Sequence, residues 1–253
     1  MAMTYRCVAG MATMPSRSHS APKALETLMG QFATIHLVLN GYRKVPGWAK
    51  VPGVSSFLPE HGTDYGAAGK LVGLSLETSL KDVAYFCVDD DMLYPSHFAR
   101  RLLQELQNEP NSIVGVHGSI IKHPFRSWSQ DRKVVSAAGW SLMNRQVDVV
   151  ATNGCAFLAE KLPLPAADWP REYRNCVDLH LSQRAKRSGL QRRIIRHRWR
   201  WIKSIELKQH DSIYRRLLTD DTLHTNLALD LLAPDQANNP ETAAKSGISG
   251  KTV

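Results

Sequence analysis

The sequence predicts an α/β fold with a mostly parallel central sheet. The first observation is a series of short apolar runs that are rich in Val, Ile and aromatic residues. The second is that amphipathic stretches with helical periodicity separate these runs. Strands that alternate with helices imply crossover connections, which place parallel strands side by side in one sheet.

The expected strands are nearly continuous in hydrophobicity rather than alternating between apolar and polar residues. Such continuity is typical of strands that helices cover on both faces. The predicted strands span residues 5–11, 34–40, 83–89, 112–118 and 155–159.

Two of the expected helices have clear boundary signals. Residues 21–31 follow Ser20, a candidate N-cap, and place Pro22 in the first turn, where its missing N–H costs little. Residues 177–189 read as a helix that ends at Gly189, because glycine readily adopts the left-handed conformation that terminates helices.

Two further helices are predicted between the strands. One covers residues 67–80. The other begins near Pro95 and continues through residue 108, with an apolar face on one side. That face consists of Phe98, Leu102, Leu103 and Leu106.

The chain of 253 residues, 43% of them hydrophobic, is long enough to bury one substantial core. We expect a single domain over residues 1–233 and a disordered tail over residues 234–253, where little can be buried. No apolar run approaches the roughly 18 residues of a membrane span. The start of the chain lacks the pattern of a signal peptide, so a cytoplasmic location is expected.

The four cysteines are widely spaced and form no C-x-x-C pair, which argues against a zinc knuckle or a disulfide scaffold. We expect them to be free, mostly buried thiols. They are Cys7, Cys87, Cys155 and Cys176.

The formal net charge of +9 favours a polyanionic partner, such as nucleic acid, a phosphorylated glycan or an anionic membrane surface. Much of the surplus lies in residues 184–203, where Arg and Lys are interleaved with Trp199 and Trp201. The alternative is a solvated basic helix and strand that binds no partner.

An acidic cluster carries the strongest local signal. Asp89, Asp90 and Asp91 follow an apolar strand directly, and ligands of parallel α/β sheets bind at the carboxyl ends of strands. Adjacent carboxylates repel one another, and a divalent cation with oxygen ligands would remove that cost and bridge to a diphosphate. The alternative is that these residues cap a helix or face water.

This strand and its D-x-D element resemble the metal site of GT-A glycosyltransferases, including family-2-like members. The resemblance implies a Rossmann-like three-layer αβα sandwich that transfers a sugar from a nucleotide diphosphate donor, with UDP as the expected nucleotide. It also implies a divalent cofactor, Mn²⁺ or Mg²⁺. Asp91 corresponds to the direct metal ligand, and Asp89 or Asp90 to the group near the ribose, with Asp89 also a candidate metal ligand.

Other segments follow in the order that the family implies. Thr13, Pro15 and Arg17 resemble the loop that holds the nucleobase. Asp64 and Lys70 resemble a D-x-G-x-x-x-K segment, in which glycines allow close approach to the donor. The Walker A spacing is absent here.

Two late residues complete the implied site. Asp178 stands where inverting members place their catalytic base, although Val177 replaces the acid that usually precedes it. His210 lies where many members place a histidine that completes the metal shell, and its nitrogen would suit Mn²⁺ better than Mg²⁺. As alternatives, Asp178 only complements a helix dipole and His210 is structural. In this scheme residues 1–118 bind the donor and residues 119–233 the acceptor.

The basic region follows the expected base, so it should lie near the acceptor. We favour hydroxymethylated pyrimidines in DNA, as in phage DNA modification, over a phosphorylated or lipid-linked saccharide at a membrane, because no hydrophobic anchor is evident. A non-catalytic nucleic-acid binder and a nucleotidyltransferase remain open as other classes. The residues expected to contact the polyanion are Arg192, Arg193, Arg196, Arg198, Trp199 and Trp201.

Overall fold

The computed structural model describes residues 5–60, 63–162, 174–205 and 219–233. Its centre is an eight-stranded sheet. In spatial order the strands are β3 (Val54–Phe57), β2 (Thr34–Leu39), β1 (Arg6–Thr13), β4 (Val83–Val88), β11 (Cys155–Leu158), β6 (Ser112–Gly115), β12 (Gln191–Ile194) and β9 (Arg145–Gln146).

Six of these strands run in one direction. Strands β3, β2, β1 and β4 pair in parallel, and β6 pairs in parallel with β12. Strand β11 lies antiparallel between β4 and β6, and β9 is antiparallel to β12. The prediction of a mostly parallel α/β sheet is confirmed.

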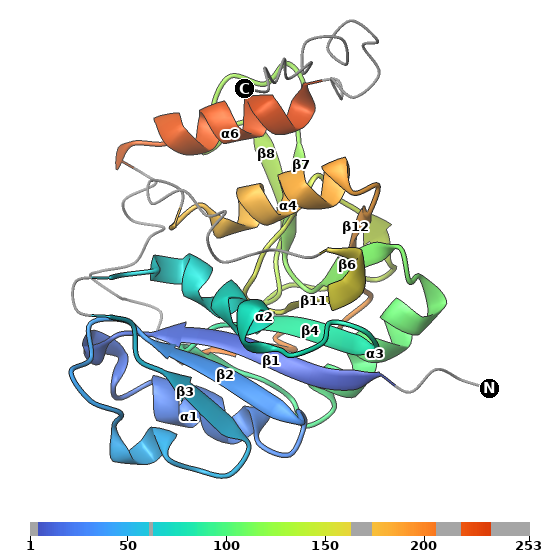
Figure 1. Cartoon of the computed structure of the whole chain (residues 1–253). Coiled ribbons are helices and arrows are strands. Elements are labelled where there is room, and N and C mark those ends of the chain that lie inside the picture. The colour runs from blue at the N-terminus through green and yellow to red at the C-terminus, as the bar shows by residue number, and fades with distance from the viewer. Residues whose placement is uncertain (1–4, 61–62, 163–173, 206–218, 234–253) are drawn as a thin grey trace, which may run out of the picture.

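Helices cover both faces of the sheet (Figure 1). Helices α1 (Ala21–Leu28) and α3 (Phe98–Asn108) lie on one face, and α2 (Val72–Leu76) and α4 (Val177–Arg187) on the other. Helix α6 (Thr222–Leu232) packs outside α4. Short 3-10 helices span Pro15–Arg17 (η1), Gly47–Ala49 (η2), Gly66–Leu71 (η3) and Ala159–Lys161 (η4).

Strand β4 explains the layered packing, because its side chains alternate between two cores. Phe86 and Val88 join the cluster beneath α1 and α3, whereas Tyr85 and Cys87 join the cluster beneath α2 and α4. All six residues of β4 are buried, as its continuous hydrophobicity predicts.

Two smaller sheets complete the fold. One consists of β10 (Val149–Val150), β7 (Gly118–Ile121) and β8 (Arg132–Val135), and the other of β13 (Lys203–Ser204) and β5 (Met92–Leu93). The predicted strand 112–118 is therefore wrong in one respect. It ends at Gly115 and a new strand begins at Gly118, in a different sheet.

The predicted helix 67–80 is also wrong in extent, since only η3 and the five-residue α2 form. Gly69 and Gly73 fit against the sheet, where an added Cβ would approach Ala12 and Tyr85. Glu77 then turns to extended backbone, where it forms an ion pair with Arg6 and a hydrogen bond with His36 at 2.6 Å instead of continuing the helix.

The helix boundaries at Pro22 and Gly189 are confirmed, with Gly189 at φ +69°. Ser20 precedes α1, but its Oγ donates to the carbonyl of Arg17 at 3.3 Å and does not cap the helix. All four cysteines are free, and all but the half-buried Cys7 are buried, as predicted. No described helix is long and apolar enough to cross a membrane.

Candidate active site

A cavity of about 660 Å³ opens at the carboxyl end of β4. Residues far apart in sequence meet there, because β4, the turn after β10 and the start of α4 all reach this edge. Three of the predicted site residues line it, namely Lys70, Asp89 and Asp178.

Lys70 is buried and forms an ion pair with Asp89. Burial alone would lower the pKa of its ammonium group, but Asp89 and Asp178 outweigh burial and raise it, so Lys70 is charged at neutral pH. Two features fix the position of the Lys70 backbone. The hydroxyl of Tyr85 donates to the Lys70 carbonyl at 2.6 Å, and Gly10 leaves the space that this carbonyl occupies.

Asp178 lies in the first turn of α4, as the sequence predicts. Its Oδ1 accepts hydrogen bonds from the backbone N–H of Thr152 at 2.8 Å and from the Thr152 hydroxyl at 2.7 Å. The same hydroxyl accepts from Lys70 Nζ at 3.2 Å. Thr152 therefore links Asp178 to the Lys70–Asp89 pair.

The remaining acids of the cluster lie beside a second cation. Arg17, at the end of η1, is buried, and its Nη1 is 3.8 Å from Asp91 Oδ2. Burial, with a smaller contribution from the neighbouring Asp91 and Asp89, raises the pKa of Asp90 to about 7, although a hydrogen bond with Thr13 and the charge of Arg17 oppose the rise. Lys70 and Arg17 therefore place positive charge beside the cluster and relieve part of the repulsion among the three carboxylates. The expectation that a divalent cation relieves the rest stays a prediction.

The structure brings the predicted nucleobase loop to the same sheet edge. Thr13, which ends β1, is buried, and Pro15 begins the η1 turn that ends at Arg17. Asp64 lies further out, where its Oδ1 accepts from the Gly66 N–H at 2.8 Å and its Oδ2 is 3.3 Å from Arg174. Asp64 thus shapes the loop before Lys70 and does not line the cavity.

The predicted basic residues do not line the cavity that contains Asp178. Arg192 and Arg193 belong to β12, and Arg193 is 3.1 Å from Glu109. Arg196 and Arg198 line a separate cavity of about 480 Å³. Trp199 is exposed, whereas Trp201 packs on Phe98 and is only 8% exposed. His210 lies outside the described residues.

Sequence reasoning missed several residues that line the cavity. His117 follows β6 at its carboxyl end, a position that the rule for parallel sheets could have found. Thr152 gave no signal of its own. Further examples are Trp128, Arg132 and His224, with Arg132 over the Trp128 ring at 4.4 Å from its centroid. Burial lowers the pKa of both His117 and His224.

The described residues assemble no group of three or more His, Cys, Asp and Glu side chains that could hold a metal ion. This does not conflict with a divalent cofactor, because Mg²⁺ is typically held by one or two carboxylates together with substrate phosphates. Asp91 fits that role, since it offers a carboxylate that is 23% exposed at the edge where the donor would lie.

No protein-family profile matches the sequence, and neither does any curated protein. Among solved structures, the chain is similar to the crystal structure of GalNAc-T7 with UDP, GalNAc and Mn²⁺, with a TM-score of 0.50 and 11% identity. The match covers 79% of this chain and 45% of that one, so this chain spans less than half of its neighbour's length. The fold is therefore the GT-A type, a Rossmann-like αβα sandwich with a mostly parallel sheet.

Proposed function

We propose that this protein is a metal-dependent glycosyltransferase that uses a nucleotide diphosphate sugar as its donor. One observation carries the proposal. The carboxyl edge of a GT-A sheet holds an ion pair between the buried Lys70 and the partly buried Asp89, and Thr152 connects this pair to the carboxylate of Asp178. The fold neighbour was crystallised with UDP and Mn²⁺, which supports the same donor chemistry here.

The donor, which we propose is UDP-linked, lies along the sheet edge from Arg17 to Lys70. Asp91 would hold Mn²⁺ or Mg²⁺ with help from Asp89, and His210 is the further ligand that we propose. The bound ion would neutralise charge on the leaving diphosphate. Lys70 adds a fixed positive charge beside it, and the loop with Thr13 and Pro15 would contact the nucleobase.

Asp178 is the proposed catalytic base. Both hydrogen bonds from Thr152 go to Oδ1, so we assign proton abstraction from the acceptor hydroxyl to Oδ2. A positioned carboxylate that activates the attacking hydroxyl supports a single displacement, with inversion at the anomeric carbon.

The acceptor that we propose carries negative charge. DNA with hydroxymethylated pyrimidines is supported by the basic run 184–203. A phosphorylated or lipid-linked saccharide is supported by an observation that the sequence did not reveal, because Trp140, Leu142 and Trp199 are strongly exposed beside the basic residues. These side chains are a candidate hydrophobic anchor, which weakens the reason for preferring DNA.

A thermal-shift screen of nucleotide sugars tests the donor assignment. A ligand that binds only the folded state raises Tm, by the equivalent of about 2.7 kcal/mol at 100 times its Kd. We expect a shift with a UDP-sugar and Mn²⁺ together that exceeds the shift with either alone. Stabilisation by nucleoside triphosphates instead would identify a nucleotidyltransferase, and stabilisation by DNA alone a non-catalytic binder.

Radiolabelled sugar transfer then separates the acceptors. Hydroxymethylated duplex DNA and a membrane lipid extract are offered in parallel with the same donor. If Asp178 is the catalytic base, the variant Asp178→Asn should not transfer sugar to either acceptor. Sugar transfer by this variant at the wild-type rate would show that Asp178 is not the base.

A further inference from the structure

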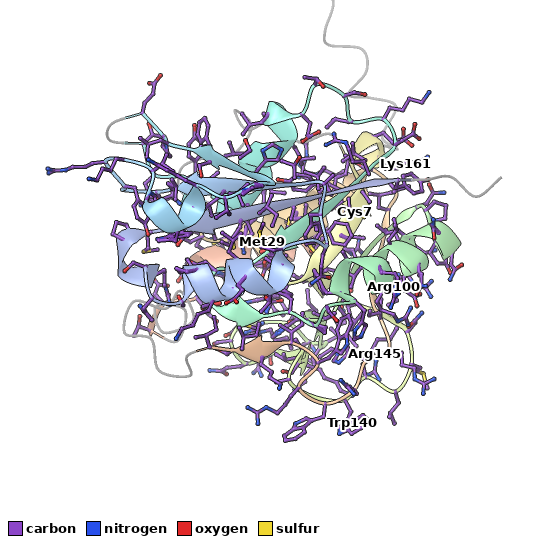
Figure 2. All side chains as sticks on the ribbon, turned by 90° about the horizontal axis from the view of Figure 1, so that it is seen from below. Cys7, Met29, Arg100, Trp140, Arg145 and Lys161 are labelled. Atoms are coloured by element: carbon purple, nitrogen blue, oxygen red, sulfur yellow. The ribbon has the colours of Figure 1, made fainter. Side chains whose placement is uncertain are left out.

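Two neighbouring loops at one end of the molecule expose large apolar side chains. Trp140, Leu142 and Met143 are 67%, 72% and 64% exposed, and Trp199 is 57% exposed. Within the described part of the chain, no other large hydrophobic residue is as exposed. Figure 2 shows Trp140 projecting outward from the body of the protein.

Backbone hydrogen bonds hold these loops together. Ser141 and His197 exchange two N–H to carbonyl bonds, each 3.0 Å long, and the N–H of Arg200 donates to the carbonyl of Ala138 at 3.1 Å. Ser141 is fully buried. Because side chains alternate along extended backbone, its neighbours Trp140 and Leu142 point away from the protein. The apolar tip is therefore held in place before any partner binds.

The same loops are strongly basic and contain no acidic residue over residues 136–146 or 195–204. Arg196 and Arg198 are exposed, and neither has a carboxylate partner among the described residues. Both line a cavity of about 480 Å³ together with Trp140 and Leu142. Positive charge and exposed apolar surface are therefore next to each other. The further cations on these loops are Arg145, Arg200 and Lys203.

We propose that these two loops, the Trp140 surface, dock the protein on an anionic lipid bilayer. Exposed apolar patches rimmed by polar residues mark interaction sites. Tryptophan is favoured at the level of lipid headgroups, and basic residues beside it are attracted to anionic lipids. Insertion of Trp140 and Leu142 would bring Arg196 and Arg198 to the headgroups.

A nucleic acid fits this surface less well. Single-stranded nucleic acid is bound by a basic groove with aromatic side chains on which bases stack. Leu142 and Met143 offer no flat ring for stacking, although they are among the most exposed side chains of the surface. Insertion into a hydrocarbon layer uses aliphatic and aromatic side chains alike.

The Trp140 surface is connected to the candidate active site through a short segment. Strand β13 follows Trp199 and pairs with β5, which begins directly after Asp91. The N–H of Ile205 donates to the Asp91 carbonyl at 2.8 Å. If the proposed transferase function holds, docking would place the cavity near acceptors carried by the membrane; membrane binding itself does not depend on that function.

Co-sedimentation with lipid vesicles tests the proposal without donor or metal. We expect binding to vesicles of phosphatidylcholine and phosphatidylglycerol that is at least about tenfold tighter than to phosphatidylcholine alone, and weaker at high salt. Quenching of tryptophan fluorescence by brominated lipid should fall in Trp140→Phe. Equal sedimentation with and without the anionic lipid would contradict the charge argument.

Matched variants distinguish lipid binding by the Trp140 surface from nonspecific binding by exposed apolar side chains elsewhere. The double variant Trp140→Ser, Leu142→Ser should reduce vesicle binding about tenfold or more. Leu229→Ser, which removes an apolar side chain that is 48% exposed on α6, should leave it unchanged. Each variant is first shown to melt like the wild type.

Three outcomes would overturn the proposal. One is wild-type vesicle binding by the double variant. Another is binding to duplex or single-stranded DNA that requires Trp140 while vesicles are not bound. A third is self-association through Trp140, seen by light scattering, with no binding to lipid. The thermal shift with UDP-sugar is measured on the same samples, so a failure of membrane docking is distinguishable from a failure of the transferase proposal.

Discussion

The backbone N–H and the hydroxyl of Thr152 both donate to the Asp178 carboxylate and hold it at the edge of the cavity. Asp178→Asn retains the side-chain shape but cannot take a proton. We expect kcat to fall by a factor of about 10² to 10⁴, with donor affinity little changed. Single-turnover transfer assays and calorimetric titration of the donor measure the two quantities. A parallel loss of donor affinity would assign Asp178 to binding instead.

The buried Lys70 and the partly buried Asp89 form an ion pair, and each residue compensates the charge of the other. Lys70→Met leaves the partly buried Asp89 unpaired and should destabilise the fold by about 3 kcal/mol. The double variant Lys70→Met, Asp89→Asn removes the unpaired charge as well and should recover part of that loss. Urea unfolding of the two single variants and the double variant measures the coupling. Strict additivity of the two single effects would show that the pair is not energetically linked.

At this scale the sequence identified the acids and the lysine but not what connects them. Asp89, Lys70 and Asp178 carry local signals, because each lies at a strand end, a glycine-rich turn or a helix start. Thr152 has no such signal. Its role depends on the turn after β10 reaching two other elements, which is a tertiary property.

At the scale of elements, β1 and η3 approach so closely that only glycine fits between them. A Cβ on Gly10 would lie 1.8 Å from the carbonyl oxygen of Lys70 and 2.2 Å from the hydroxyl of Tyr85. The carbonyl belongs to the backbone, so a side chain cannot simply rotate out of the way. Gly10→Ala should therefore cost about 3 kcal/mol or more, beyond ordinary overpacking, and displace Lys70.

Gly47 provides the matched control for this prediction. An added Cβ there would meet nothing within 4 Å, so Gly47→Ala should change the free energy of unfolding by less than about 1 kcal/mol. Chemical denaturation compares the two variants. Similar stabilities for Gly10→Ala and Gly47→Ala would show that β1 and η3 are not packed as described.

Helix α6 is fastened through Asp221, the residue just before it. Its Oδ2 accepts hydrogen bonds from the Ser127 hydroxyl and the Ser129 N–H, both at 2.7 Å, and the Ser127 bond is the main reason that the pKa of Asp221 falls to about 2. Because the folded state lowers the pKa of this carboxyl, Asp221 stabilises the fold at pH values above about 4, the pKa of Asp in the unfolded chain. This stabilisation is lost as the pH falls toward 2, the pKa in the folded state.

Asp221→Asn should therefore destabilise the protein by about 1 kcal/mol at pH 7, a value reduced for solvent screening of this surface group. The difference from wild type should shrink as pH falls from 5 to about 3. Urea unfolding at several pH values follows this difference. A constant difference across that range would mean that the charge of Asp221 is not what holds α6.

Periodicity largely predicted whether a segment forms a strand or a helix, but it did not predict where these elements end. In the run 112–118 only Ser112 and His117 are polar, and neither identifies Gly115 as the end of the strand. The stretch 67–80 has helical periodicity, but Gly69 and Gly73 are used for close packing against the sheet and Glu77 for an ion pair and a hydrogen bond. In both cases tertiary contacts override the local pattern.

Across the whole molecule, the order of strands could not be read from hydrophobicity. Strand β11 resembles the parallel strands in composition, yet it lies antiparallel between β4 and β6. It shares their environment, because all four of its residues are buried between helices on both faces. A pattern that reports burial cannot report direction, which is set by how the chain returns from the sheet of β7, β8 and β10.

Helix α6, which lies outside α4, should be less stable than the central strands of the sheet. Strands β1 and β4 contribute to the two cores on either side of the sheet, whereas α6 packs only against a smaller cluster formed with α4 and residues such as Trp128. Regions with few buried apolar contacts open at lower free energy than the global unfolding reaction. We therefore expect α6 to open locally while the sheet remains folded.

Hydrogen exchange followed by mass spectrometry tests this at pH 7. Amides of α6 should exchange well before those of β1 and β4, and Leu227→Ala, which removes a buried side chain from the smaller cluster, should accelerate exchange in α6 without changing the exchange of β4. Because Trp128 and His224 line the cavity, a bound donor or acceptor that touches them should slow exchange in α6. Simultaneous exchange of α6 and β4 would show instead that the molecule opens as one cooperative unit, with the cavity wall no weaker than the sheet.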